Sequence, residues 1–216
     1  MIKLNYSAIL LAAGSGTRLN LGYNKVFYKF SDGKTIIEKS VEAFEKHPLC
    51  NQIILVISSQ DEQQMRELFG ERVEYVIGGS TRQQSSYHGL QLVRNDRVLI
   101  HDGARCFVSQ RILDDCVAAL MQYDAVCVMV PAKDTIKRVI GGVIEETYDR
   151  STLMCAQTPQ GFKTKLIKQC TEVSIIENLK VTDDASIVEM CSDVDVHVVM
   201  GDYDNIKITT IEDIRE

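Results

Sequence analysis

The sequence predicts an α/β protein whose mostly parallel, twisted sheet carries helices on both faces. Short runs of β-branched residues recur along the chain, and helical patterns lie between them. This alternation is typical of parallel strands that are joined by right-handed crossovers. The length of 216 residues, of which 45% are hydrophobic and 25% charged, suits one globular domain over residues 1–216 with a projecting arm.

Apolar runs predict the buried strands of this sheet. They cover residues 6–11, 52–58, 73–78, 97–102 and 125–131. Amphipathic stripes predict two of the helices that join them, over residues 35–47 and 109–123. Ser109 precedes the second helix and is a residue type that favours the N-cap.

The pattern changes after residue 131. Residues 135–149 alternate apolar and polar side chains about Gly141 and Gly142, which predicts a β-hairpin. The hairpin is too polar for the main sheet, so we expect an arm over about residues 133–156 that clasps a second subunit. An exposed hairpin without a partner is the alternative. Helices at 163–171 and 183–191, strands at 196–200 and 205–210 and a last helix are expected to follow.

The charge and the cysteines exclude several classes of function. A net charge of −6 and a pI of about 5.3 disfavour binding to nucleic acid or to an anionic membrane. No apolar run is long enough to span a bilayer. The 7 cysteines include no C-x-x-C pair, so we expect reduced core thiols in a cytoplasmic protein.

A glycine loop follows the first strand. Its small residues are Ala12, Ala13, Gly14 and Gly16. The dinucleotide fingerprint fails because Leu19 occupies the position of its third glycine, and the P-loop pattern fails as well. Backbone N–H groups in such a loop can form an anion nest, and Arg18 and Lys25 would add cations at its end. A tight turn with two surface cations is the alternative.

A carboxylate ends the strand at 97–102. In open α/β sheets, ligands bind beyond the carboxyl edges of the strands. Asp102 would repel a phosphate there unless a divalent cation lay between them, and Mg²⁺ commonly uses one or two carboxylates together with substrate phosphates. A salt bridge to Arg105 is the alternative. His101 should point to the opposite face of the strand, so we do not expect a catalytic dyad.

Further polar stretches follow other strands. Gly78 and Gly79 open at the same edge, where their backbone could contact a flat base, and Ser80, Arg82 and Ser85 add polar groups. Candidate contacts to a second phosphate, on an acceptor, are Arg150, Thr158 and Thr182. Lys207 and Asp204 lie near the start of the last predicted strand. Each stretch taken alone is also compatible with a structural turn.

Taken together, these stretches resemble the 2-C-methyl-D-erythritol 4-phosphate cytidylyltransferases. The matching segments, in family order, are LLAAGSGTRL…NK, GGSTRQQSS, HDGAR, KDTIKR, YDRSTLMCAQTPQGF, TDDAS and DNIKITT. The resemblance covers about residues 6–213, and AQTPQGF with DNIKIT is far more specific than the glycine loop. It implies a Rossmann-like body, a homodimer formed through the β-arm, and transfer from CTP to a sugar-alcohol phosphate with Mg²⁺ in non-mevalonate isoprenoid synthesis.

The resemblance also implies roles for individual residues. Arg18, Lys25 and Lys207 would be catalytic, and Asp102 would contact the metal. The residues implied at the nucleotide are Ala12, Ala13, Gly14, Gly16, Gly78, Gly79, Arg82, Ser85, Asp102 and Ala104. Those implied at the acceptor phosphate are Thr135, Arg150, Thr158 and Thr182. Arg150 would come from the arm of one subunit and Thr182 from the pocket of the other, so that the dimer completes the site.

Some positions depart from the family pattern. Asn24 stands where the family usually has Pro, which predicts a less pre-set loop, and Val26 and Phe27 stand in place of Gln-Tyr. Gly103 and Cys106 replace Ala and Pro. Two other functions stay open: a cytidylyltransferase for another polyol phosphate, such as ribitol 5-phosphate, and a nucleotide-binding module without catalysis.

Overall fold

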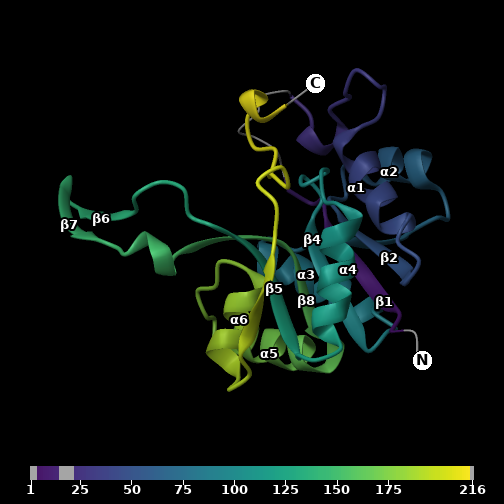
Figure 1. Cartoon of the computed structure of the whole chain (residues 1–216). Helices are drawn as coiled ribbons and strands as arrows, with labels where there is room; N and C mark the ends of the chain where they lie inside the picture. The colour runs from purple at the N-terminus through teal and green to yellow at the C-terminus, as the bar shows by residue number, and fades with distance from the viewer. Residues whose placement is uncertain (1–3, 15–21, 215–216) are drawn as a thin grey trace.

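The computed structural model describes residues 4–14 and 22–214 and shows an α/β fold (Figure 1). In these residues, seven strands form one sheet in the order β3-β2-β1-β4-β8-β5-β9. Their bounds are β1 (Tyr6–Leu11), β2 (Cys50–Ile57), β3 (Glu74–Ile77), β4 (Arg97–Asp102), β5 (Ala125–Pro131), β8 (Met154–Lys163) and β9 (Val196–Met200). The neighbouring strands pair in parallel, except that β8 runs antiparallel to β4 and β5. The predicted mostly parallel sheet is confirmed.

Helices cover both faces of the sheet, as predicted. One face packs against α1 (Ile36–Glu45), α2 (Glu62–Phe69) and α4 (Gln110–Leu120), and the other against α3 (Arg82–Leu92), α5 (Thr164–Ile176) and α6 (Asp184–Cys191). Strand β1 shows the alternation that this requires, because Leu10 joins the first core and Ile9 the second. Burial of these apolar side chains on both faces is the main favourable contribution to the stability of the sheet.

Local signals explain where the predicted helices begin. Thr35 and Glu38 form a capping box at the start of α1. The hydroxyl of Ser109 accepts a hydrogen bond from the backbone N–H of Ile112, so the predicted N-cap of α4 is confirmed. Inside α1 the apolar stripe, which includes Val41 and Phe44, is fully buried against the sheet.

The predicted hairpin is confirmed and projects from the body (Figure 1). Strands β6 (Lys137–Ile140) and β7 (Val143–Thr147) pair about Gly141 and Gly142, whose φ values of 58° and 82° are costly for other residues. The short helix η3 (Arg150–Thr152) then leads into β8. The arm is thus an insertion between β5 and β8, which are hydrogen-bonded neighbours in the sheet.

Two expectations about the second half of the chain are wrong. Residues 205–210 form no strand, and only the 3-10 turn η4 (Ile211–Asp213) follows them in place of a helix. The segment lies on the loops above the sheet: the N–H of Ile208 donates to the carbonyl of Ala104 at 2.9 Å, and the Asp213 carboxylate accepts from the N–H of Thr209 at 2.7 Å. Its backbone groups are therefore satisfied without a strand partner.

The remaining elements lay outside the predictions or differ in length. Strand β8 was not predicted, and α2 and α3 were given no bounds. Helix α5 continues to Ile176, beyond the expected end at 171.

All seven cysteines belong to the described residues, and each is a free thiol. No helix within 4–14 and 22–214 combines the length and the apolar character that crossing a membrane requires.

Candidate functional site

An open cavity of about 520 Å³ lies at the carboxyl ends of β1 and β4. Its lining includes the following predicted nucleotide contacts: Ala12, Ala13, Gly14, Gly79, Arg82, Ser85, Asp102 and Ala104. The predicted catalytic residues Lys25 and Lys207 line it as well. Gly16 and Arg18 lie outside the described residues. The predicted convergence at this edge of the sheet is therefore found for these residues, whereas Gly78, which the structure also describes, is not part of the lining.

Two glycines let the walls of the cavity approach each other. A Cβ on Gly78 would lie 2.6 Å from the Cβ of Ala13 and 2.8 Å from the hydroxyl of Ser85. On Gly79 it would lie 2.3 Å from the Cβ of Gln84. Because contacts this short do not occur, both positions require glycine. The absence of a side chain at Gly78 thus leaves room for Ala13 and Ser85, which form one wall of the cavity.

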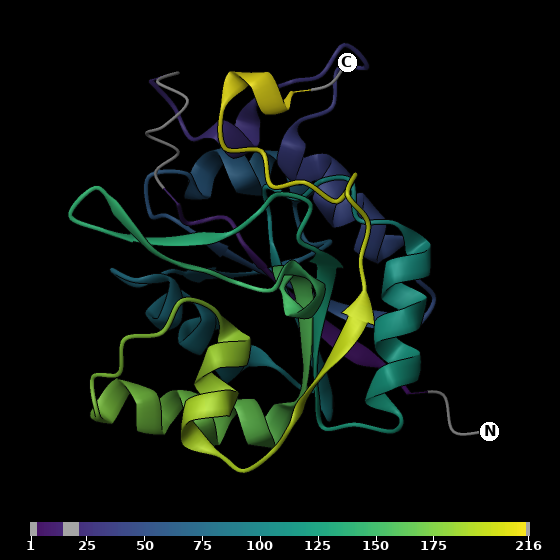
Figure 2. The same cartoon turned by 60° about the vertical axis from the view of Figure 1, so that its left-hand side comes forward.

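The two lysines meet although they come from opposite ends of the chain. The Lys25 amine donates to the carbonyl of Ile208 at 2.7 Å, across a sequence separation of 183. Ile208 is the residue that follows Lys207, whose amine lies 2.9 Å from Asp102 Oδ2. Figure 2 shows the C-terminal segment, in yellow, beside the purple segment that carries Lys25. The cationic groups therefore share one cavity.

A small apolar cluster anchors the segment that carries Lys207. The buried side chain of Ile208 packs with Phe30, Ile36 and Cys106. Cys106 thus fills an apolar role at the position where the family usually has Pro. Gly103 is a tight position, because a Cβ there would come within 3.1 Å of the Leu11 carbonyl oxygen. These two departures leave the charged groups of the cavity in place.

Asp102 is surrounded by cations. Among the described residues, Lys207 lies at 2.9 Å from its carboxylate, and Arg82 and Arg105 each lie at 3.7 Å. Burial alone would raise the pKa of Asp102, but the charges of Lys207 and Arg82 outweigh burial and lower that pKa to about 2. The carboxylate is therefore ionised at neutral pH, and its ion pair with Arg105 was one of the predicted alternatives.

Arg82 is held from its other side by a carboxylate that we did not predict. Its Nη1 lies 2.7 Å from Oδ2 of Asp184, whose side chain is fully buried at the start of α6. Burial alone would lower the pKa of Arg82, but the charges of Asp184 and Asp102 raise it, so the guanidinium stays charged. In the sequence, TDDAS gave no role for Asp184, and its neighbour Asp183 caps α6 by accepting a hydrogen bond from the N–H of Ser186.

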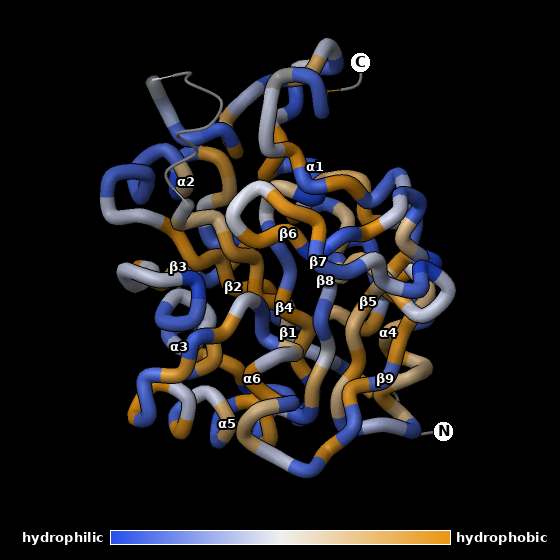
Figure 3. Tube along the Cα trace, turned by 90° about the vertical axis from the view of Figure 1, so that its left-hand side faces the viewer, coloured by the Kyte–Doolittle hydropathy of each residue, from blue (hydrophilic) through white to orange (hydrophobic). Residues whose placement is uncertain are grey.

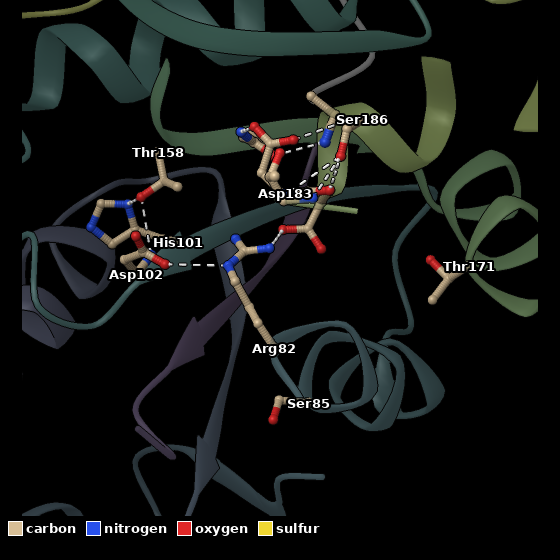
Figure 4. A network of polar contacts seen from close by, with 12 residues as sticks. Arg82, Ser85, His101, Asp102, Thr158, Thr171, Asp183 and Ser186 are labelled. Atoms are coloured by element: carbon tan, nitrogen blue, oxygen red, sulfur yellow. Dashed lines mark hydrogen bonds and ion pairs between the residues drawn. The ribbon is translucent and has the colours of Figure 1, made fainter. Parts of the chain in front are cut away.

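A buried histidine supports the backbone of Asp102. The carbonyl of Arg105 can only accept, so His101 Nε2, at 3.0 Å, must carry the proton. Nδ1 then accepts from the Thr158 hydroxyl at 2.9 Å, and that hydroxyl accepts from the Asp102 N–H at 3.0 Å (Figure 4). Burial lowers the pKa of His101 to about 4, which keeps the ring neutral. His101 therefore positions its neighbours, and no catalytic dyad with Asp102 is formed.

The predicted acceptor contacts are dispersed within one chain. Thr158 is buried in β8 and is engaged as described above. Thr135 and Arg150 lie on the arm, where Arg150 donates to the carbonyl of Lys133 at 2.6 Å. The N–H of Thr182, just before α6, donates to Ser186 Oγ at 3.3 Å. Among the residues that the structure describes, none of these four lines the cavity, and their roles at the acceptor stay predictions.

Comparisons with known proteins agree on one family. Residues 6–216 match the family model described as 2-C-methyl-D-erythritol 4-phosphate cytidylyltransferase. A protein of that name from Geobacillus thermodenitrificans is 43% identical, over 98% of this chain and 94% of its own length. Its counterpart from Bacillus velezensis is 39% identical, over 98% and 93%.

Solved structures give the same result. The 4-diphosphocytidyl-2C-methyl-D-erythritol synthase of Anaerococcus prevotii superposes with a TM-score of 0.85 at 34% identity, over 97% of this chain and 94% of its own. The 2-C-methyl-D-erythritol 4-phosphate cytidylyltransferase of Francisella tularensis gives 0.83 at 32% identity, over 97% and 96%. The similarity therefore spans nearly the whole chain, including the segments that form the cavity.

Proposed function

Because the chain belongs to the 2-C-methyl-D-erythritol 4-phosphate cytidylyltransferase family, we propose that it transfers the cytidylyl group of CTP to 2-C-methyl-D-erythritol 4-phosphate. A phosphate oxygen of the acceptor attacks the α-phosphorus of CTP in line. The bond between the α-phosphorus and the bridging oxygen of the β-phosphate breaks, and pyrophosphate leaves with the electron pair. The product has a role in the synthesis of isoprenoid precursors.

The observation that carries this proposal is the meeting of Lys25 and Lys207 in one cavity. The acceptor phosphate is already anionic near neutral pH, so the reaction needs no strong general base. Its obstacle is the repulsion between two anions, which positioning and fixed cations reduce. Lys25, Lys207 and Arg82 supply positive charge at the cavity of a protein whose net charge is −6.

The glycine-lined wall fits the other end of the nucleotide. Ala12, Ala13 and Ser85 form a surface of small side chains, and Gly78 lets them approach each other. A flat base can lie close to such a wall, within reach of backbone N–H and C=O groups. We assign the cytosine and the ribose to this side of the cavity, and the triphosphate to the side with the lysines.

The cavity suits Mg²⁺ that is held largely by the substrate. Asp102 is the carboxylate among the described residues of its lining, and those residues contain no group of three His, Cys, Asp or Glu side chains that could hold a metal alone. One ionised carboxylate fits an ion that takes its other ligands from phosphates and water. When bound, Mg²⁺ supplies charge neutralisation at the phosphates. Asp102 meanwhile orients the amine of Lys207.

The acceptor site is proposed to be completed by a second copy of the chain in the cytoplasm. Thr135 and Arg150 would reach from the arm of one subunit toward Thr158 and Thr182 of the other. The arm supports this arrangement because it exposes apolar side chains. These are Ile136, Val139, Ile140, Val143, Ile144 and Tyr148. Figure 3 shows the arm facing the reader, with the tube of β6 coloured as hydrophobic. Val139 pairs with Ile144 and Ile140 with Val143, so each face of the hairpin carries exposed apolar side chains. Exposed apolar surface gathered on one projecting element is typical of an interaction site.

A pyrophosphate-release panel tests the proposed function. It crosses CTP, UTP, ATP and GTP with methylerythritol phosphate, ribitol phosphate and glycerol phosphate. We expect release with CTP and methylerythritol phosphate to exceed every other pair. Preference for ribitol phosphate would replace the acceptor and keep the reaction class. Binding of CTP without release in any pair would favour a module without catalysis.

A further inference from the structure

Asn24 makes a set of buried hydrogen bonds beside the cavity. It precedes the short helix η2 (Lys25–Phe27), and its side chain is almost fully buried. Its Nδ2 donates to the carbonyl of Ala12 at 3.0 Å and to Asp61 Oδ2 at 2.8 Å. Its Oδ1 accepts from the N–H of Val26 at 3.3 Å. One amide therefore ties together the end of β1, the start of α2 and the first turn of η2.

The partners of Asn24 are themselves fixed. Asp61 Oδ2 also accepts from the Ser58 hydroxyl at 2.8 Å, just after β2. The N–H of Ala12 donates to the carbonyl of Val56 at 2.8 Å, so Ala12 is bound to β2 as well. Asn24 thus connects Lys25 to a part of the sheet that is held by other bonds.

The groups that Asn24 connects line opposite sides of the proposed nucleotide site. Ala12 belongs to the wall assigned to the base and ribose, and Lys25 carries the amine assigned to the phosphates. Asn24 itself is absent from the described lining of the cavity. We propose that Asn24 is a positioning residue that sets the distance between the base wall and the phosphate-binding amine of Lys25. The proposal deepens the proposed function and rests on it.

The backbone of Asn24 explains how it can stand where the family usually has Pro. Its φ of −63° and ψ of 123° are values that proline also adopts. Proline fixes φ by its ring but offers no hydrogen bond to Ala12 or Asp61. The side-chain bonds of Asn24 constrain this position in place of the ring. The expectation of a less pre-set loop stays a prediction, because residues 15–21 lie outside the described residues.

A double-mutant cycle with Lys25 tests whether Asn24 acts through that lysine. Asn24→Ala removes buried hydrogen bonds, one of them to a carboxylate, and should lower kcat/KM for CTP roughly 10- to 30-fold. In the Lys25→Ala background, the same change should cost less than about threefold, because its target is gone. The KM of the acceptor should stay within about twofold in Asn24→Ala.

The cycle has a matched control and a contradicting outcome. Asn51→Ala removes an exposed asparagine whose Oδ1 accepts from Asn95, and it should leave kcat/KM unchanged. Urea unfolding of each variant confirms that the assays use folded protein. If Asn24→Ala lowered kcat/KM for CTP by the same factor with and without the Lys25 amine, the proposal would be overturned, because the effect would be independent of Lys25.

Two further substitutions separate the side chain from the backbone. Asn24→Asp brings a second carboxylate against Asp61 and should reduce kcat/KM more than Asn24→Ala does; adding Asp61→Asn should recover part of that loss. Asn24→Pro keeps φ through its ring but removes the side-chain bonds to Ala12 and Asp61, so its activity should lie between those of Asn24→Ala and the wild type. Wild-type activity in Asn24→Pro would assign the role to φ and end the proposal.

One readout does not depend on cytidylyl transfer. In ¹⁵N-labelled protein, the side-chain amide of Asn24 should exchange slowly with solvent, and Asp61→Ala should accelerate the exchange at least tenfold. Fast exchange in the wild type would refute the hydrogen bonds whatever the activity. If the wild type releases no pyrophosphate from CTP while this amide is protected, the proposed function fails. The hydrogen bonds by which Asn24 connects β1, α2 and η2 would still be confirmed.

Discussion

The amines of Lys25 and Lys207 are each oriented by an oxygen atom of the protein. Lys25 is bound to the carbonyl of Ile208 and Lys207 to the carboxylate of Asp102. Amines that are already oriented lose little freedom when a triphosphate arrives, and such pre-organisation is the main source of electrostatic catalysis. The buried pairs behind them, Arg82 with Asp184 and His101 with Thr158, hold the neighbouring groups in the same way.

Removal of the Lys25 amine should therefore slow the reaction while the fold survives. Lys25→Ala should lower turnover at saturating CTP roughly 10²–10³-fold, as expected for the loss of one charged contact in an enclosed site. The measurement is pyrophosphate release, with circular dichroism as the check on folding. Lys165→Ala, which changes an exposed lysine on α5, is the matched control. Full turnover of Lys25→Ala would contradict the assignment of this lysine to the phosphates.

The neutral state of His101 predicts a pH dependence of stability. An unfolded histidine binds a proton near pH 6.5, whereas the buried ring of His101 binds one only near pH 4. Between these values the unfolded chain holds more protons, so the free energy of unfolding should fall as the pH falls, by about 3 kcal/mol. Below pH 4, protonation of Asp102, whose pKa is about 2, removes further stability.

Urea unfolding between pH 7 and pH 4 measures this dependence. His101→Asn lowers the stability at pH 7, but it should also flatten the slope between pH 6.5 and pH 4. The slope is the informative quantity, because a loss of packing alone would shift the whole curve without changing it. An unchanged slope in His101→Asn would show that other groups cause the pH dependence.

Strand β8 shows how one element supports the site. It runs antiparallel between β4 and β5 and brings Thr158 beside Asp102. It is crowded near its C-terminal end, where a Cβ on Gly161 would lie 2.7 Å from Leu99 Cδ2 and 2.9 Å from Leu120 Cδ1. Glycine is therefore needed where the strand packs closely against these two core leucines.

Substitution of Gly161 should expose this crowding. Gly161→Ala should lower the free energy of unfolding by about 1–3 kcal/mol through overpacking. Gly14→Ala is the comparison, because a Cβ there meets nothing within 4 Å and should change stability by less than about 0.5 kcal/mol. Chemical denaturation measures both variants. Equal stability of the two would mean that the core beside β8 accommodates a methyl group.

The arm is the other element with a separable role. Val139 and Val143 are 53% and 66% exposed in a single chain, and a two-stranded hairpin is marginal without further packing. If the proposed dimer forms through the arm, replacing both with Ser should weaken it and raise the KM of the acceptor, with little change in the KM of CTP. Sedimentation and steady-state kinetics test this, with the exposed residue Met121, changed to Ser, as the control. An unchanged oligomeric state with an unchanged acceptor KM would remove the arm from the proposed site.

At the scale of the whole molecule, the sequence predicts those strands and helices whose buried residues recur with a simple period. The apolar runs of β1, β2, β4 and β5 and the stripes of α1 and α4 were found because each buries one kind of side chain. Helix α3 buries Ser85, Ser86 and Gly89, which leave no apolar stripe. Strand β8 buries Gln157 and Gln160, so its pattern looked like a loop.

The residues of the candidate site likewise include some that motifs predict and some that no pattern indicates. The motifs that predicted roles for Lys25, Asp102 and Lys207 belong to recognisable segments, and the structure brings the three residues to one cavity. Their roles stay predictions. Asn24 and Asp184 were missed, since a buried side chain that positions another residue has no spacing pattern of its own. The segment 205–210 was predicted as a strand because β-branched residues favour strands, but no neighbouring strand lies beside it among the described residues.

The most direct test is a crystal structure of the protein with CTP bound. We expect the cytosine to lie against Ala12, Ala13 and Ser85, and both the Lys25 and Lys207 amines to lie within about 4 Å of phosphate oxygens, the range of an ion pair. A triphosphate bound elsewhere, or one that touches neither amine, would contradict the claim that cations from both ends of the chain hold the nucleotide.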